Sequence, residues 1–247
     1  IFVHPHTGDG STTIGAAIEM NRQSGGKPLR LDMADVGLGV DFTDASIEMA
    51  IRRFGSALKY KKLGEPSTYA AGRIAEGKII GWFHGREEYG PRSLGHRCIL
   101  ADPRNVALKN RINRDIKGRE LWLPVAASIL AENGDDYFEA FVSTPHMARA
   151  FTARPEHADF IKGALHSDST SRVQAVGKKD YKPFRKLLQN FYRRTNMPMV
   201  LNSSLNRHGE PIVHRPFEAL QLLMDTPLDE LIIGNYSVQK GISLDDD

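Results

Sequence analysis

The feature of this chain that most restricts its fold is the alternation of helical and apolar segments after residue 68. Helical spacing, capping residues or a terminal glycine predict helices over 69–77, 102–114, 184–191 and 216–225, with Asp102 capping the second. Short apolar runs predict buried strands over 78–84, 123–130, 197–202 and 230–236. This order is typical of an α/β domain, in which helices pack on a sheet and loops leave the strand ends.

The first 62 residues are organised differently. A glycine-rich turn, "HTGDGSTTIGAA", leads into a short helix of small residues. A second helix is predicted from helical spacing over 47–58, behind a cap at Thr43 or Asp44. The stretch "KKLGEPST" at 61–68 has the composition of a linker. We therefore predict a domain boundary between residues 62 and 63.

Composition and charge exclude several classes of protein. The excess of 33 Lys and Arg over 30 Asp and Glu suits anionic ligands but is too small by itself to indicate nucleic acid binding. No apolar run approaches the length of a membrane helix, and the first residues have no targeting segment. A single cysteine, Cys98, excludes an internal disulfide and suits a reducing compartment. We expect a cytoplasmic protein and, because the chain does not begin with methionine, a piece of a longer one.

Charged and amide side chains gather in four separate stretches, of which "GREEYGPRSLGHR" at 85–97 is the most highly charged. The candidate site residues are Arg92 and Arg97 in this loop, Lys117 and Arg119 in "KGR", Arg172 in "HSDSTSRVQAV", and Asn202, Ser204 and Asn206 in "LNSSLN". Arginine offers a planar fork to phosphate oxygens, lysine a point charge, and serine and asparagine hydroxyl and amide donors. The pattern is compatible with solvated loops or with one pocket for a polyphosphate and an acyl phosphate. A Walker A run, a dinucleotide fingerprint and an HExxH pair are absent from the sequence.

Four longer stretches carry a family resemblance. "GWFHGREEYGPRSLGHRCILADPR", "KGRELWLPVAAS", "HSDSTSRVQAV" and "LNSSLNRHGEPIV" occur in collinear order over most of the chain. Together they resemble the C-terminal region of the O-carbamoyltransferases, a family with nodulation-factor and antibiotic-tailoring members. The resemblance implies a YrdC/Sua5-like twisted open α/β sheet with flanking helices over 63–247. It also implies that 1–62 is the end and linker of a Kae1-like domain of the actin-ATPase type.

The resemblance also implies a mechanism. The YrdC-like domain of this family joins carbamoyl phosphate to ATP, giving carbamoyl-adenylate and pyrophosphate, and the Kae1-like domain passes the carbamoyl group to a hydroxyl acceptor. By matched position, Arg92, Lys117, Arg172 and Ser204 would hold phosphate or carbamoyl oxygens. Arg97, Arg119, Asn202 and Asn206 would shape the substrate and ATP pocket, with Glu87 and Glu88 holding the guanidiniums in place.

Metal ions are predicted only from the family resemblance. Asp9, in "GDG", matches a carboxylate that ligates iron in the full-length Kae1-like domain, whose histidine pair lies upstream of this chain. Mg²⁺ is expected with the ATP substrate. We expect this chain alone to catalyse at most the adenylation half-reaction.

The chain departs from its relatives at two places, and it leaves two other functions open. Leu123 stands where relatives carry a second arginine, a loss that Arg114 could offset, and His208 stands where an arginine usually precedes "GEP". The alternatives are an RNA- or nucleotide-binding YrdC-like module without transferase activity and an inactive scaffold. RNA is disfavoured because exposed aromatic residues are not interleaved with the arginines. For Lys117 we expect an ammonium that points into the cleft, whose loss changes the melting temperature little.

Overall fold

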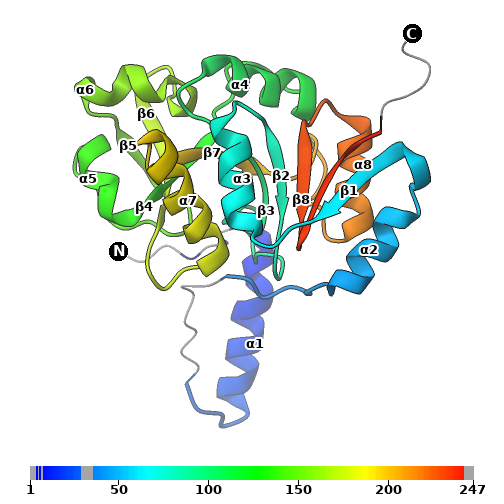
Figure 1. Ribbon diagram of the computed structural model, residues 1–247. Helices are drawn as coiled ribbons and strands as arrows, with labels where there is room; N and C mark the ends of the chain where they lie inside the picture. Colours follow the sequence, from blue (N-terminus) through cyan, green and yellow to red (C-terminus); the bar gives the residue numbers. More distant parts are fainter. Residues whose placement is uncertain (1–3, 5, 7, 29–35, 242–247) are drawn as a thin grey trace.

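The structure is a computed structural model that describes residues 4, 6, 8–28 and 36–241 (Figure 1). The strands are β1 (Leu58–Lys62), β2 (Ile80–Phe83), β3 (Arg97–Ala101), β4 (Ala126–Leu130), β5 (Ala150–Thr152), β6 (Thr170–Val176), β7 (Met199–Ser204), β8 (Glu230–Ile233) and β9 (Tyr236–Lys240). The α-helices are α1 (Thr12–Gln23), α2 (Asp44–Arg52), α3 (Pro66–Ala75), α4 (Val106–Arg111), α5 (Gly134–Tyr137), α6 (Pro155–Ala158), α7 (Lys182–Thr195) and α8 (Pro216–Asp225). A π-helical segment, Ile112–Lys117, continues α4.

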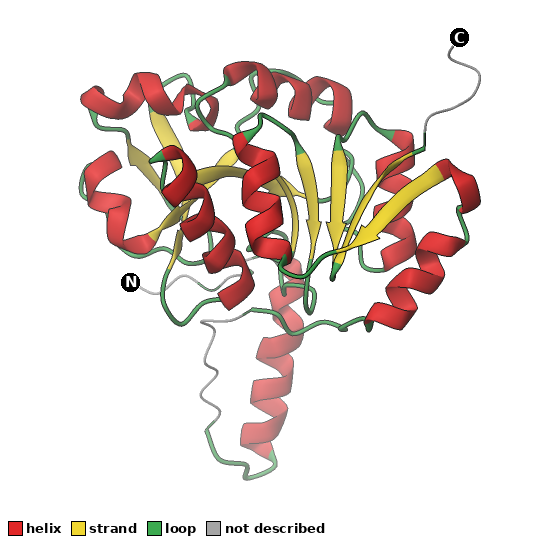
Figure 2. Ribbon diagram, viewed as in Figure 1, coloured by secondary structure: helices red, strands yellow, loops and turns green. Residues whose placement is uncertain are grey.

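The nine strands form one mixed sheet in the order β1-β9-β8-β2-β3-β7-β4-β6-β5. Only the pairs β2–β8 and β4–β6 are parallel, and the other neighbours are antiparallel. Helices surround this sheet (Figure 2). The predicted α/β sheet with flanking helices is therefore confirmed.

The centre of the sheet is buried on both faces, because helices cover it. Every residue of β2, β3, β4 and β8 is buried, as expected for strands that read as continuous apolar runs. On one face α3 packs against α7. The small residues Ala70, Ala71 and Gly72 of α3 let the two helices approach closely, while Phe184 and Phe191 of α7 fill the core.

Three local expectations need correction. The expected linker is mostly ordered secondary structure, because β1 runs to Lys62 and α3 begins with Pro66 at its first turn. The helix expected to start at Asp102 starts later, at Val106. Its cap is Asn105, whose side chain accepts a hydrogen bond from Ala107 N at 2.9 Å, while the Asp102 carboxylate is bound to Arg104.

The N-terminal part contains one helix inside the fold and one outside it. Thr43 caps α2 as predicted, accepting a hydrogen bond from Ser46 N at 3.2 Å, and α2 contributes Ile47 and Ile51 to the core. By contrast, α1 has no buried residue and projects from the body of the protein (Figure 1). Since β1 pairs with β9, residues 58–62 belong to the same sheet as the later strands. The domain boundary after residue 62 stays a prediction.

Within the described residues, no helix is both long and apolar enough to cross a membrane.

Candidate functional site

Five of the predicted site residues line one small recess at an edge of the sheet. The recess has a volume of about 70 Å³. It is lined by Pro91, Arg92, Ser93, Arg119, Pro124, Ala126, Met147, Arg172, Asn202, Ser203 and Ser204. The sequence predicted Arg92, Arg119, Arg172, Asn202 and Ser204 among these, so the separated stretches do converge.

Strand register explains why they converge. Because β4 and β7 are antiparallel, the start of β4 lies beside the end of β7, with Ala126 opposite Asn202. Ser204 lies opposite Cys98, at the start of β3 and just after the loop that carries Arg92. Arg172 precedes Val173, which lies opposite Ala127. Loops and strand ends that are far apart in the chain therefore meet at one edge.

Arg172 is the most unusual residue of the recess. Its Nε is buried and has no hydrogen-bond partner among the described residues. The pKa of Arg172 is lowered to about 10, mainly by burial and, to a smaller extent, by the neighbouring charges of Arg92 and Arg119. A buried donor without an acceptor is costly, and so is a cation surrounded by cations. This arrangement favours an anion in the recess.

Arg119 is anchored but keeps part of its guanidinium for a ligand. Its Nε donates to Asn113 Oδ1 at 2.9 Å and its Nη2 to the Pro124 carbonyl at 3.1 Å. Burial lowers the pKa of Arg119. None of the residues that line the recess is a carboxylate. The recess is therefore positively charged without a compensating anion from its own wall.

Lys117 lies beneath this wall and does not line the recess. Its ammonium donates to the Ser204 carbonyl at 2.6 Å, to Ser204 Oγ at 3.0 Å and to the Asn206 carbonyl at 3.0 Å, and it also contacts Asn206 Oδ1 at 2.5 Å. Burial lowers the pKa of Lys117 to about 7, with a smaller contribution from the charge of Arg119. The four oxygens act in the opposite direction, because they accept from the protonated form.

The expectation that Lys117 points freely into a cleft is therefore wrong. Lys117 is only 4% exposed, and its hydrogen bonds hold the turn that follows β7. Asn206 belongs to this turn and also donates from Nδ2 to the Glu210 carbonyl. The expected small effect of losing Lys117 on the melting temperature does not fit a side chain with these contacts.

Arg97 and the two glutamates of the charged loop also have other roles than expected. Arg97 is fully buried away from the recess: its Nη1 donates to the Gly85 carbonyl at 3.0 Å, and its guanidinium lies over the Phe83 ring at 3.5 Å. Glu88 holds backbone amides instead of guanidiniums, with Oε1 accepting from Leu94 N at 2.7 Å. Glu87 pairs with His214. These side chains shape the loop from inside.

Glycine is required where this loop turns back into β3. Gly95 has a φ of +115°, which side-chain-bearing residues rarely adopt. A Cβ atom there would lie 2.6 Å from a ring carbon of Phe184 in α7. The loop therefore passes close to the core at Gly95, which places the residues just before it at the recess.

Sequence reasoning missed several residues of the site. Met147 lines the recess with a backbone φ of +54°, a strained value for a residue with a long side chain. Ser93 also lines it, and the buried Ser128 and Gln174 connect to the recess because both accept hydrogen bonds from Asn202. A polar residue inside an apolar strand, as in "AASIL" or "RVQAV", is the signal that could have found the last two.

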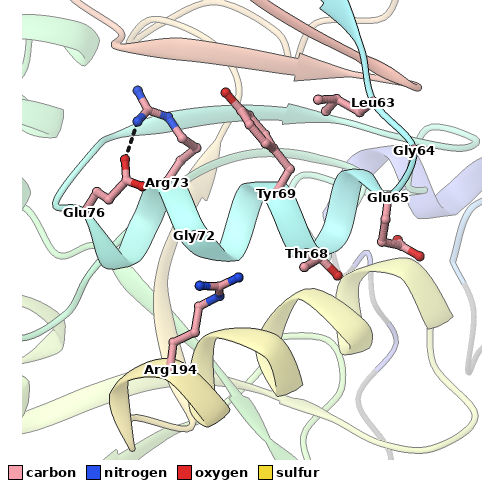
Figure 3. A pocket seen from close by; sticks show the side chains of 9 residues that line it. All are labelled: Leu63, Gly64, Glu65, Thr68, Tyr69, Gly72, Arg73, Glu76 and Arg194. Carbon is pink, nitrogen blue, oxygen red and sulfur yellow. Dashed lines mark hydrogen bonds and ion pairs between the residues drawn. The ribbon is translucent and has the colours of Figure 1, made fainter.

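A larger hollow lies between α3 and α7, and it differs in its charge balance (Figure 3). Its volume is about 410 Å³. Arg73, on its wall, is bound to Glu76 and to the buried Glu230, so its charge is neutralised by carboxylates. Arg194 reaches across from α7 towards Gly72 (Figure 3). This hollow lacks the uncompensated charge of the recess.

The expected offset from Arg114 and the expected metal ligand do not form part of the recess. Arg114 is exposed and pairs with Asp115 at 2.6 Å. Asp9 is exposed in a short 3₁₀ turn, Asp9–Ser11. Among the described residues, no group of three His, Cys, Asp or Glu side chains could hold a metal ion. Asp9 therefore does not fit an iron site within this part of the chain.

Comparisons with known proteins agree on one family. The family model for the carbamoyltransferase C-terminus matches residues 71–240. Nodulation protein NolNO of Sinorhizobium fredii is 34% identical over 244 residues, which are 97% of this chain and 36% of that relative. The 3'-hydroxymethylcephem-O-carbamoyltransferase of Amycolatopsis lactamdurans is 26% identical over 240 residues, which are 97% of this chain and 44% of that relative. The chain thus spans less than half the length of these curated relatives.

Among solved structures, full-length HypF in the phosphate- and nucleotide-bound form is similar with a TM-score of 0.47 and 20% identity. The similarity covers 69% of this chain and 25% of that one.

Proposed function

Because this chain belongs to the carbamoyltransferase C-terminus family, we propose that it binds carbamoyl phosphate and ATP at the arginine recess and forms carbamoyl-adenylate. It would do so as part of an O-carbamoyltransferase. The observation that supports this most strongly is the charge balance of the recess. Arg92, Arg119 and Arg172 face it, no carboxylate lines it, and the buried Nε of Arg172 has no partner among the described residues.

The size of the recess suits one reacting group at a time. A volume of about 70 Å³ has room for a few water-sized groups, which is the scale of a phosphoryl or carbamoyl group. A whole nucleotide does not fit in this space. We therefore place a phosphate of one substrate inside, with the rest of the nucleotide over the rim that Arg92 forms.

The chemistry requires positive charge that is already in place. Carbamoyl-adenylate keeps only the α-phosphate of ATP, so pyrophosphate leaves, and inorganic phosphate leaves carbamoyl phosphate with the consumption of water. Charge develops on the leaving phosphates, and fixed guanidiniums stabilise it without reorganisation. Ser204 offers a hydroxyl at the same edge, oriented by Lys117, which donates to its Oγ.

The family implies two metal ions, Mg²⁺ with the ATP substrate and iron in the transfer step. No carboxylate lines the recess, so its walls lack the protein ligand that Mg²⁺ usually takes, and we derive no step through this ion. Iron belongs to the transfer of the carbamoyl group to a hydroxyl acceptor. We assign this transfer to a Kae1-like domain outside the described fold, because Asp9 has no partners for a metal site in it.

The test is the exchange of labelled pyrophosphate into ATP with and without carbamoyl phosphate, accompanied by calorimetry of both ligands. We expect exchange that depends on carbamoyl phosphate and that falls by roughly a hundredfold in Arg172→Met. The matched control is Arg194→Met, which removes an exposed guanidinium from α7 and should exchange normally.

Folded protein that gives no heat with either ligand would contradict the proposal. Filter binding to RNA in parallel distinguishes the alternative of an RNA-binding module.

A further inference from the structure

The loop that carries Arg92 is held to the sheet by three consecutive carbonyl groups. Asn202 Nδ2 donates to the Ser93 carbonyl at 3.1 Å, and Gln174 Nε2 donates to the Leu94 carbonyl at 2.8 Å. Trp82 Nε1 donates to the Gly95 carbonyl at 2.8 Å. The three donors come from β7, β6 and β2, and all are buried. We call these three side chains the loop clamp.

Two members of the loop clamp are themselves oriented by a buried hydroxyl. Ser128 Oγ donates to Gln174 Oε1 at 2.7 Å and accepts from Asn202 Nδ2 at 2.9 Å. Ser93 Oγ donates to Asn202 Oδ1 at 2.9 Å. Because a backbone carbonyl can only accept, the Leu94 and Ser93 carbonyls require the amide nitrogens on their side, and Ser128 donates to the Gln174 oxygen that then faces it. The Gln174 amide nitrogen is thereby directed at the Leu94 carbonyl.

A loop at this position needs such restraint because of its charge. Arg92 is exposed, immediately precedes the clamped residues, and lies near enough to lower the pKa of Arg172. The two guanidiniums repel each other, so an unrestrained loop would move Arg92 away from the recess. Ordering the loop before binding also lowers the entropic cost of capturing an anion.

We propose that Gln174 is a positioning residue that acts through Arg92, with Ser128 setting its orientation. The inference rests on the proposed anion site, and it adds that affinity depends on a buried amide that touches no ligand. Gln174 is only 3% exposed and does not line the recess. Gln174 can therefore affect binding only through its hydrogen-bond partners, which are the Leu94 carbonyl of the loop and, directly and by way of Ser128, Asn202. A double-mutant cycle with Arg92 distinguishes the two routes.

The test compares three variants with the unmodified full chain by calorimetry, with inorganic pyrophosphate as the probe. Gln174→Met keeps the approximate volume and removes the donor, and Ser128→Ala is a milder change that removes only the orienting hydroxyl. We expect Gln174→Met to weaken pyrophosphate binding about fivefold to tenfold, and Ser128→Ala about threefold. The matched control is Asn190→Leu, which removes a buried amide of α7 whose hydrogen bonds are to Thr68, Lys186 and Arg193 and not to the loop clamp. It should leave the affinity unchanged.

The decisive readout is a double-mutant cycle with Arg92→Ala. If Gln174 acts through Arg92, then Gln174→Met weakens binding by less than twofold once Arg92 is already alanine. Equal weakening in both backgrounds, or no weakening in the wild-type background, would overturn the proposal.

Amide hydrogen exchange of the ligand-free chain separates this inference from the proposed function. We expect faster exchange at residues 92–95 in Gln174→Met and not in Asn190→Leu. Unchanged exchange there overturns the positioning role whatever the ligand does. If the loop does loosen but the unmodified chain fails to bind pyrophosphate, the anion site is wrong, and the proposed role of Gln174 in binding falls with it.

Discussion

The arginine recess and the hollow between α3 and α7 both contain arginine side chains, yet their charges are handled in opposite ways. In the hollow, Arg73 is bound to Glu76 (Figure 3). It is also bound to Glu230, which accepts from Tyr69 at 2.9 Å. In the recess, Arg172 has cations as its neighbours, and its buried Nε has no partner among the described residues. The hollow is the larger of the two, at about 410 Å³ against about 70 Å³.

If the recess binds an anion as proposed, charge balance and not volume distinguishes the binding site from the structural pocket in this protein. A guanidinium paired with a buried carboxylate holds the fold together, because removing either partner leaves a buried charge. A guanidinium without an anion costs free energy in the empty protein, and a ligand recovers it. Substitutions in the recess should therefore change ligand affinity, and substitutions in the hollow should change the free energy of unfolding.

The largest expected effect is the loss of pyrophosphate affinity in Arg172→Met. Charge-assisted hydrogen bonds contribute about 1.5 to 3 kcal/mol each, so pyrophosphate affinity should fall by about tenfold to a hundredfold. The free energy of unfolding should stay the same or rise, because a buried cation among cations is replaced by an apolar side chain. Calorimetry and urea unfolding measure both quantities. A clear loss of stability without loss of affinity would place Arg172 in the structural class.

The opposite pattern is expected for Arg73→Met in the hollow. Glu230 is fully buried, so losing its guanidinium should lower the free energy of unfolding by about 2 to 3 kcal/mol. Tyr69 and Ser237 still donate to the carboxylate and limit the loss. Pyrophosphate affinity should change by less than about twofold, since Arg73 is remote from the recess. Unfolding curves of Arg194→Met, an exposed neighbour, provide the baseline.

Lys117→Met should affect both quantities, because this lysine holds the fold and the site together. It would leave the Ser204 and Asn206 oxygens without their donor, which costs about 1 to 2 kcal/mol of unfolding free energy. Release of the turn after β7 should weaken pyrophosphate binding by about tenfold. The free energy of unfolding and the pyrophosphate affinity should be measured on the same preparation. An unchanged melting temperature would show that the buried contacts of Lys117 contribute nothing to stability.

The smallest effect is a pH dependence of binding, best measured with sulfate, whose charge is constant over the range. The pKa of Lys117 is lowered to about 7, so its positive charge is lost as pH rises through that value. Sulfate affinity should therefore fall by about twofold to threefold between pH 6 and pH 9. Lys117→Met should flatten this profile; an identical slope in the variant would assign the titration to another group.

The same lowered pKa has the opposite sign for stability. The unfolded chain holds a proton on Lys117 up to its ordinary pKa near 10.5, whereas the folded chain releases it from about 7. The contribution of Lys117 to the free energy of unfolding therefore rises with pH between these two values. Urea unfolding across that window should show the rise in the wild type and not in Lys117→Met.

The sequence predicted many of the elements, because these depend on local pattern. Apolar runs such as 78–84 predicted buried strands, and five of the predicted polar residues line the recess, whose role in anion binding stays a prediction. The sequence did not predict the direction in which each side chain points. Arg97 and Arg172 are both arginines in polar stretches, but packing turns Arg97 onto Phe83 and leaves Arg172 at the recess.

The roles of Lys117 and Gln174 also could not be predicted from the sequence. The "KGR" motif predicted a ligand-facing ammonium, yet the acceptors of Lys117 come from residues 204 and 206, which only the folded sheet brings near. Gln174 lies in the stretch "HSDSTSRVQAV" but was not predicted as a site residue, although its amide holds the loop of Arg92. Partners that are distant in the chain decide both roles.

The most direct test of an uncompensated recess is the side-chain Nε–H resonance of Arg172, followed by NMR during a titration with pyrophosphate. The buried Nε lacks an acceptor in the described structure, so a bound anion should shift this resonance strongly and protect its proton from exchange. The Nε–H of Arg73, which already donates to Glu230 at 2.6 Å, should not move. A titration in which the Arg172 resonance stays fixed while those of other arginines shift would contradict the account.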